Sequence, residues 1–223
     1  MERKWYLDLW ALIREPFKRG IPEIVEFGTT QRGFACAIGM VAISLAISWI
    51  IEAGVSFALG ASALHLGVLL GVMAGAGIFT LVFYALITFA VLAIYSVLFS
   101  QIANKFGAHT NHESILKICW YQSAYSMVIS LALSIVEVIL VLIIRGLSLD
   151  IYAPDMILYI IGFSYTIFQV VAYIWCFWVS LTLMARQIEK GRLATFGIGI
   201  LASLIPVAFI GILVGMVMLA TSR

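Results

Sequence analysis

The chain of 223 residues is 64% hydrophobic and only 11% charged, and its mean hydropathy is +1.12. This composition lies outside the range of a soluble globular domain and indicates a membrane protein. The formal net charge is +2, and no basic run with interleaved aromatic residues occurs, so the sequence does not favour nucleic-acid binding. Its three cysteines lie in or beside apolar segments and are interpreted as small hydrophobic residues rather than as a disulfide or zinc framework.

A polar and basic segment, residues 1–33, precedes the first long apolar stretch. Within it, residues 5–13 predict an amphipathic helix, with Asp8 placed away from the apolar side. The apolar side holds Trp5, Leu9, Leu12 and Ile13. Such a helix, flanked by Lys and Arg, is expected to lie flat on the cytoplasmic leaflet. It would anchor the N-terminal tail or, alternatively, dock a cytosolic partner.

Long apolar stretches follow in chain order, and each can supply the roughly 20 helical residues that cross about 30 Å of hydrocarbon. The predicted spans are residues 34–52, 77–100, 119–145, 156–185 and 194–220. Residues 55–75 are also apolar, and four alternatives stay open for them. They could form a sixth span, an outside-facing hairpin, a membrane-embedded piece that does not cross, or an extension of the second span.

The distribution of Lys and Arg favours five spans. With the N-terminus inside, eleven of the thirteen Lys and Arg residues fall in inside segments, and only Arg145 and Arg223 lie outside. Positive residues in short loops stay on the cytoplasmic side, whereas six spans would move the basic loops outside. We therefore expect an all-α, polytopic transmembrane helical bundle with five spans, N-in and C-out, in the cell membrane.

Regularly spaced glycines indicate close helix packing. Gly67, Gly71 and Gly75 recur every four residues, and Gly211 and Gly215 repeat the pattern in the last span. Such smooth faces let another helix backbone approach closely. They predict packing within the chain, with association of a second copy as the alternative.

Glu137 is the one acidic or basic residue that lies well inside a predicted span. Going back along the helix, serines fall on the same face at spacings of three and four residues: Ser134, Ser130, Ser126 and Ser123. A charge near the bilayer centre costs about 2.5–3.5 kcal/mol on insertion scales, so this face is expected to turn toward other helices. Glu137 would hydrogen-bond to Gln169 or to a serine, or it would serve as the carboxyl of a proton-coupled carrier.

A polar loop contains His109, His112 and Glu113, whose order matches no zinc-enzyme signature. We expect no metal there, and instead an N-cap from Thr110 or Asn111 for the helix that begins the third span. Motifs for nucleophilic or metal-dependent hydrolysis are absent from the sequence, so neither an enzyme nor a cofactor is expected.

Four short stretches resemble the Yip domain family of five-span membrane proteins: Leu12-Ile-Arg-Glu-Pro-Phe, Phe99-Ser-Gln-Ile-Ala-Asn-Lys-Phe-Gly, Trp120-Tyr-Gln-Ser-Ala-Tyr and Tyr173-Ile-Trp-Cys-Phe-Trp-Val-Ser-Leu. Residues 34–220 would then be a Yip-like transmembrane domain. Eukaryotic members have a long cytosolic region and are implicated in binding Rab-type GTPases and in vesicle traffic. The short N-terminal segment here is more similar to a prokaryotic member, for which the resemblance implies no defined reaction.

These patterns together predict a non-catalytic membrane scaffold or organiser that acts through helix, lipid or protein contacts. Its expected partners are the lipid bilayer, a second copy of the chain or other membrane proteins. The alternative is a small proton- or ion-coupled transporter or channel centred on Glu137.

Overall fold

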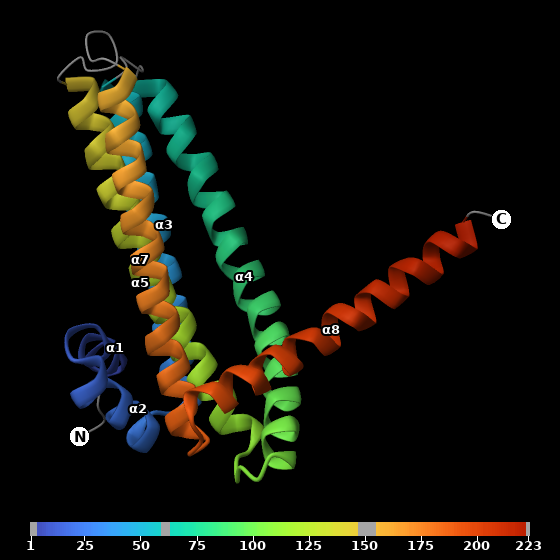
Figure 1. The fold of residues 1–223 in the computed structure, drawn as a ribbon. Helices are drawn as coiled ribbons and strands as arrows, with labels where there is room; N and C mark the ends of the chain where they lie inside the picture. Colours follow the sequence, from blue (N-terminus) through green and yellow to red (C-terminus); the bar gives the residue numbers. More distant parts are fainter. Residues whose placement is uncertain (1–3, 59–62, 147–154, 222–223) are drawn as a thin grey trace.

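A computed structural model describes the backbone of residues 4–58, 63–146 and 155–221, and the side chains of residues 4–51, 53, 75–144 and 159–208. Three short elements come first: α1 (Trp5–Arg14), the π-helical turn η1 (Pro16–Gly20) and α2 (Ile21–Phe27). Long helices follow: α3 (Thr30–Ala58), α4 (Ala63–Lys105), α5 (His112–Gly146), α7 (Asp155–Gln187) and α8 (Arg192–Thr221) (Figure 1). The described residues contain no strand, which confirms the predicted all-α class.

Four of the long helices are long and apolar enough to cross a membrane. Their apolar stretches are Thr30–Ile51, Gly75–Lys105, His112–Ile144 and Tyr159–Gln187. They coincide with the first four predicted spans and indicate a multi-pass membrane protein. In α8 the described side chains contribute a shorter apolar stretch, Arg192–Ala208, so a fifth crossing over residues 194–220 stays a prediction.

The apolar tract of residues 55–75 is divided between two helices. α3 continues to Ala58, and α4 runs without interruption from Ala63 to Lys105. Residues 63–75 are therefore helical and continuous with the helix that contains the second predicted span. At 1.5 Å per residue, a helix of 43 residues is about 65 Å long, roughly twice the hydrocarbon thickness. α4 must tilt in a bilayer or project beyond it.

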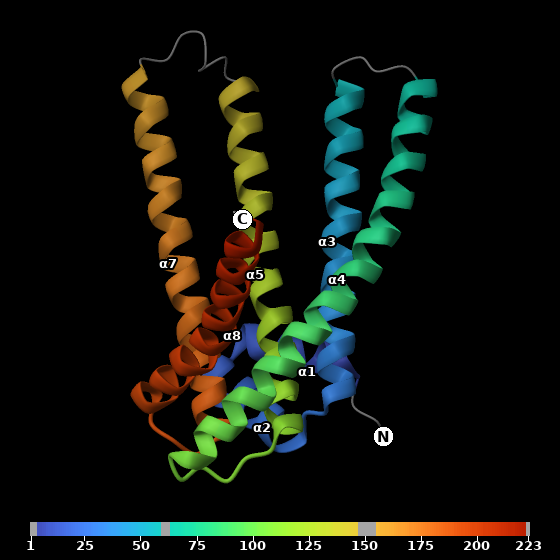
Figure 2. The ribbon, with the colours of Figure 1, turned by 90° about the vertical axis from the view of Figure 1, so that its right-hand side faces the viewer.

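The long helices meet at one end of the molecule, which we call the closed end. It contains α1, η1 and α2 together with the turns at residues 106–111 and 188–191 (Figures 1 and 2). Away from it, the pair α3 and α4 separates from the pair α5 and α7 (Figure 2). α8 crosses α4 and then leaves the bundle (Figure 1).

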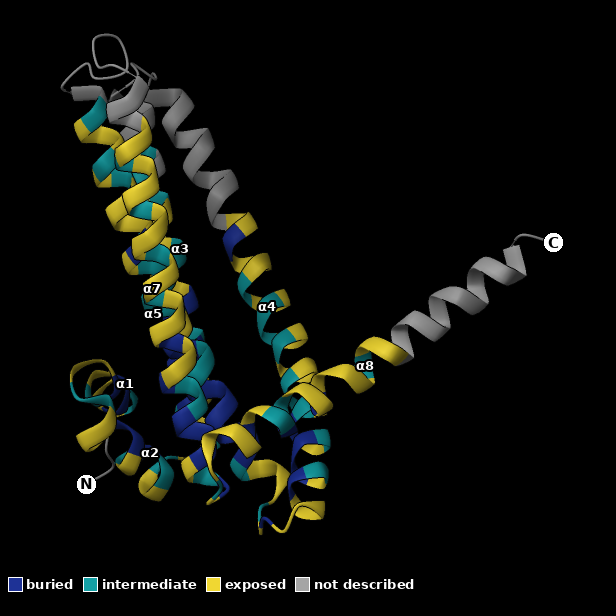
Figure 3. Ribbon diagram, viewed as in Figure 1, coloured by how far each residue is buried: buried dark blue, intermediate teal, exposed yellow. Residues whose placement is uncertain are grey.

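Most of the buried residues lie at the closed end (Figure 3). The largest fully buried side chains there include Trp120, Tyr121, Phe99, Leu12, Ile21 and Ile24. Farther along α4, α5 and α7 the side chains are apolar and exposed, as expected for helices that face hydrocarbon. The protein core is therefore built where the N-terminal elements pack against the helix bundle.

The turn between α4 and α5 is fixed by local hydrogen bonds. Gly107 has a φ of +75°, and the amide of Ala108 donates to the carbonyl of Ala103 at 3.0 Å, which is the usual glycine-based end of a helix. At the start of α5, the amide of Ser114 donates to Oδ1 of Asn111 at 2.8 Å. This contact makes Asn111, one of the two predicted candidates, the N-cap.

The N-terminal segment packs against the bundle as well as offering an apolar surface. The apolar side of this helix was expected to face the cytoplasmic leaflet, but Leu9 and Leu12 are buried in the protein core, and Asp8 is also buried, with 2% of its surface exposed. Placing Asp8 away from the apolar side was wrong, because it lies three residues after Trp5 and four before Leu12 and so shares their face. Another face of α1 remains exposed and carries Trp10.

Candidate functional site

Glu137 lies on a part of α5 that the described neighbouring residues leave largely exposed. Its side chain is exposed, as is that of Ser134, whereas Ser130 is half-buried. We expected this face to be shielded by other helices. It is not shielded in the described structure, because the pair α3 and α4 separates from α5 and α7 toward that end (Figure 2).

The partner of Glu137 is a tyrosine of α7. The hydroxyl of Tyr165 lies 3.4 Å from Oε2 of Glu137 and donates a shorter bond of 2.8 Å to the carbonyl of Leu133. The predicted partner, Gln169, is half-buried one helical turn after Tyr165. Ser134 donates to the carbonyl of Ser130 within its own helix at 3.0 Å. The carboxylate thus contributes to the α5–α7 contact through Tyr165.

Two neighbouring cavities form a lateral cleft between α4, α5, α7 and α8. Their volumes are about 460 Å³ and 550 Å³. Both are lined by the same four residues: Tyr95, Gln122, Phe177 and Ser180. The remaining lining residues are mostly apolar, and Ser126 of the predicted stripe lines the second cavity. Glu137 lines neither cavity.

Polar groups in and beside the lateral cleft hold the helices at fixed positions. Nε2 of Gln122 on α5 donates to the carbonyl of Ser180 on α7 at 2.7 Å. The hydroxyls of Tyr84 on α4 and Ser123 on α5 lie 2.9 Å apart. Hydrogen bonds between spanning helices are favourable where water is scarce, typically by about 0.6–2 kcal/mol each. The helices around the cleft are therefore joined by hydrogen bonds, and most of the cleft surface is apolar.

Of the predicted glycines, only Gly75 lies among the described side chains, and other glycines make the close contacts there. A Cβ atom at Gly77 of α4 would overlap the Trp49 indole of α3, and one at Gly33 would lie 3.0 Å from Cβ of Trp120. At Gly75 nothing lies within 4 Å. Gly75 and Gly77 are two positions apart, which places them on different sides of the helix. The environments of Gly67, Gly71, Gly211 and Gly215 lie outside the described side chains.

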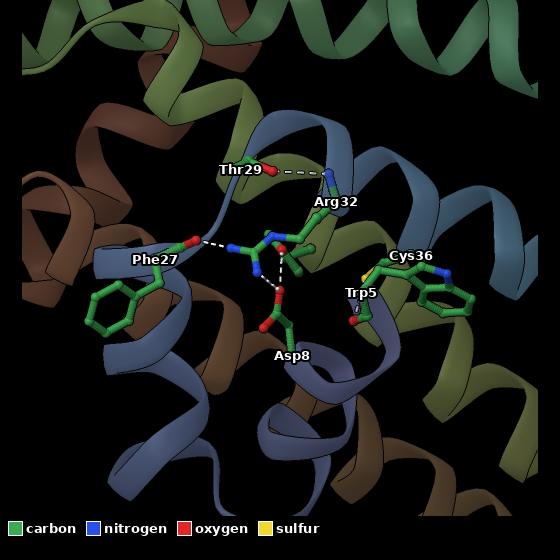
Figure 4. Close-up of polar contacts among 7 residues, drawn as sticks. Trp5, Asp8, Phe27, Thr29, Arg32 and Cys36 are labelled. Carbon is green, nitrogen blue, oxygen red and sulfur yellow. Dashed lines mark hydrogen bonds and ion pairs between the residues drawn. The ribbon is translucent and has the colours of Figure 1, made fainter. Parts of the chain in front are cut away.

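A cluster of polar contacts joins the N-terminal segment to α3 and α5, and we call Asp8, Arg32 and Tyr121 the N-terminal clamp. Oδ2 of Asp8 lies 3.6 Å from Nη1 of Arg32 and accepts a hydrogen bond of 2.8 Å from the hydroxyl of Tyr121. The Arg32 guanidinium also donates to the carbonyl of Phe27, and the Arg32 amide to Oγ1 of Thr29 (Figure 4). The buried carboxylate is thus both paired and hydrogen-bonded, as a buried charge requires.

Two further contacts fasten the same segment. Sγ of Cys36 lies 3.3 Å from the carbonyl of Trp5 (Figure 4), and Nζ of Lys117 donates to the carbonyl of Val25 at 3.0 Å. The bond from Lys117 satisfies a carbonyl in the last turn of α2, where a positive charge is favourable. The N-terminal elements are therefore an integral part of the closed end.

The polar loop with His109, His112 and Glu113 is held in place by hydrogen bonds to the side chain of Asn104. The Asn104 side chain bonds both the amide and the carbonyl of Thr110, at 3.0 and 2.9 Å. No group of three His, Cys, Asp or Glu side chains in the described part of the chain is placed to hold a metal ion. The loop closes the turn between α4 and α5.

The N-terminal clamp could have been found in the sequence, at least in part. Asp8 follows Trp5 by three residues and precedes Leu12 by four, and a carboxylate on an apolar helix face calls for a cationic partner. Its actual partners, Arg32 and Tyr121, come from distant positions, and nothing local indicates them.

Comparison of the chain with family models, with curated proteins and with solved structures finds no match in any of the three.

Proposed function

We propose that this chain is a non-catalytic, five-span membrane scaffold of the Yip-like kind, whose lateral cleft holds the acyl chain of a bilayer lipid. The observation that carries the proposal is the cleft itself, whose two cavities are lined mainly by apolar side chains of helices with membrane-spanning length. Ligand sites are commonly apolar cavities with a few polar groups that fix orientation. In a bilayer, acyl chains are the apolar molecules that surround such a cleft.

The positions of the Lys and Arg residues support an orientation in which the N-terminus lies on the cytoplasmic side. The N-terminal segment and the turns at residues 106–111 and 188–191 gather at the closed end (Figure 1). The predicted cytoplasmic Lys and Arg residues lie in the N-terminal segment, in these turns or on the helix ends beside them. The closed end would therefore face the cytoplasm, with the exposed Trp10 of α1 at the level of the headgroups.

Filling the cleft tests the proposal. Gly199 lies in the wall of the first cavity, and a Cβ there would be 3.5 Å from the Tyr95 hydroxyl, so Gly199→Leu can enter the cavity without meeting the backbone. We expect this variant to lose co-purifying lipid in native mass spectrometry. Gly162→Leu is the matched control, because nothing lies within 4 Å of that position. Equal lipid retention in both variants would reject the acyl-chain site.

The alternative, a carrier centred on Glu137, has less support. A carrier binds its substrate in a cavity between helices, and the two cavities of the cleft lack Glu137 among their lining residues. Its Tyr165 contact gives the carboxylate a place in the α5–α7 pair without any substrate.

A further inference from the structure

A separate polar pocket of about 810 Å³ lies at the closed end, between α2 and the α7–α8 turn. Five charged residues line it: Glu26, Arg186, Glu189, Lys190 and Arg192. None of the five forms an ion pair with another residue in the part of the chain that the structure describes. Three positive and two negative residues thus line one open pocket, with no ion pair formed between them in the described part of the chain.

Arg192 is held in place by contacts that leave its outer nitrogens uncommitted. Its Nε donates to Oγ1 of Thr182 at 2.9 Å, and its guanidinium carbon lies 4.5 Å from the centre of the Trp178 ring. No described residue accepts from Nη1 or Nη2, the two groups that bind a phosphate in a fork. Fixing the side chain before binding reduces the entropy lost when a ligand arrives.

The start of α8 adds a second group of donors beside Arg192. The first intrahelical bond there is from the amide of Thr195 to the carbonyl of Gly191, so the preceding amides of the first turn have no partner within the helix. A helix N-terminus favours an anion, and Lys190 and Arg186 line the same pocket. These groups together suit a phosphate.

The two carboxylates argue for a ligand that also carries a positive group. Glu26 and Glu189 would repel a purely anionic ligand, but an amine beside the phosphate could pair with them. We propose that this pocket binds the headgroup of an aminophospholipid, with the phosphate on Arg192, Lys190 and Arg186 and the ammonium on Glu26 and Glu189. The inference rests on the proposed membrane scaffold, which brings the closed end to the cytoplasmic headgroups.

Short-chain lipids test this inference, because they reach the pocket in detergent. Apparent affinities for dihexanoyl phosphatidylethanolamine, phosphatidylcholine and phosphatidylglycerol, and for inorganic phosphate, are obtained from the shift of the unfolding midpoint of the full chain. We expect phosphatidylethanolamine to bind at least tenfold more tightly than the other three. An ammonium with hydrogens can donate to a carboxylate, whereas a quaternary amine cannot.

Substitutions then assign the groups. Lys190→Gln and Arg192→Gln should each weaken phosphatidylethanolamine binding by at least fivefold, and Lys18→Gln, the same charge change outside the pocket, should have no effect. Replacing both Glu26 and Glu189 by Gln should remove the preference over phosphatidylglycerol. Because Arg192 also contacts Thr182 and Trp178, the Lys190→Gln variant tests the pocket without disturbing that packing.

Several results would overturn the inference. Equal or tighter binding of phosphatidylglycerol would reject recognition of the amine, and equal binding of inorganic phosphate would mean a free phosphate site. Unchanged affinity in Lys190→Gln would reject the pocket. Headgroup selectivity that persists in Gly199→Leu while the cleft retains no lipid would show that the two sites are separate. If Gly199→Leu keeps its lipid, the acyl-chain proposal fails. The headgroup inference is then decided by the affinities for the short-chain lipids and inorganic phosphate alone.

Discussion

The hydroxyl of Tyr121 on α5 donates a hydrogen bond of 2.8 Å to the Asp8 carboxylate on α1, although the two residues are 113 positions apart. Tyr121 is fully buried and Asp8 nearly so. The bond therefore joins the N-terminal segment to the centre of the closed-end core. A charge-assisted hydrogen bond in such a place is stronger than one at the surface.

Removing that hydroxyl should loosen the closed end. We expect Tyr121→Phe to lower the free energy of unfolding by about 1–3 kcal/mol, because a buried carboxylate loses a donor. Asp8→Ala should cost more, since it also leaves Arg32 without its carboxylate. Denaturant unfolding in mild detergent measures both. Tyr6→Phe is the control: Tyr6 lies on α1, like Asp8, but is exposed, so this variant should keep the wild-type stability. A similar loss of stability in all three variants would contradict a role for the clamp.

Two glycines of α4 provide a matched test of close packing. Gly77→Ala should lower the thermal stability in detergent, because the new methyl group overlaps the Trp49 indole and must displace it. Gly75→Ala should leave stability unchanged or raise it slightly, since its side is open and alanine favours the helix. A thermal shift measurement on the two variants decides the matter. Equal destabilisation would mean that α3 and α4 pack on another face.

Glu137 and Tyr165 can be separated by substitution. Glu137→Gln should leave the free energy of unfolding unchanged or raise it, because the lost contact of 3.4 Å is long and a neutral amide is less costly than a carboxylate inside a membrane span. Tyr165→Phe should cost about 1 kcal/mol, because it removes the bond to the Leu133 carbonyl. Proton flux in proteoliposomes is the second measurement. Flux in the wild type that Glu137→Gln abolishes would favour the carrier over the scaffold.

The grouping of basic segments at the closed end leads us to expect one topology. Cysteine labelling or reporter fusions should place the N-terminus, residues 106–111 and residues 188–191 on the cytoplasmic side. Residue 223 should lie on the opposite side if α8 crosses the membrane. A cytoplasmic residue 223 combined with cytoplasmic turns would show that α8 does not cross and would reduce the spans to four.

The helix content and most of the helix positions could be predicted because the bilayer imposes them. A span needs about 20 apolar residues whatever its neighbours are, so length and hydropathy locate α3, α4, α5 and α7. The N-cap at Asn111 was predictable for a similar reason, since capping depends on residues a few positions apart. The arrangement of residues 55–75 was left open, because the four alternatives require equally apolar residues.

Composition, span length and the distribution of Lys and Arg are local or additive properties, and by themselves they determined that this is an all-helical membrane protein with a basic side. The tertiary structure alone decided that Asp8 meets Arg32 and Tyr121, that Gly77 rather than Gly75 meets a neighbouring helix, and that Glu137 is left uncovered. The physical reason is that lipid and protein are equally apolar surroundings for a spanning helix, so hydrophobicity does not specify which face packs. That choice depends on the shapes and hydrogen bonds of side chains that only the folded chain brings together.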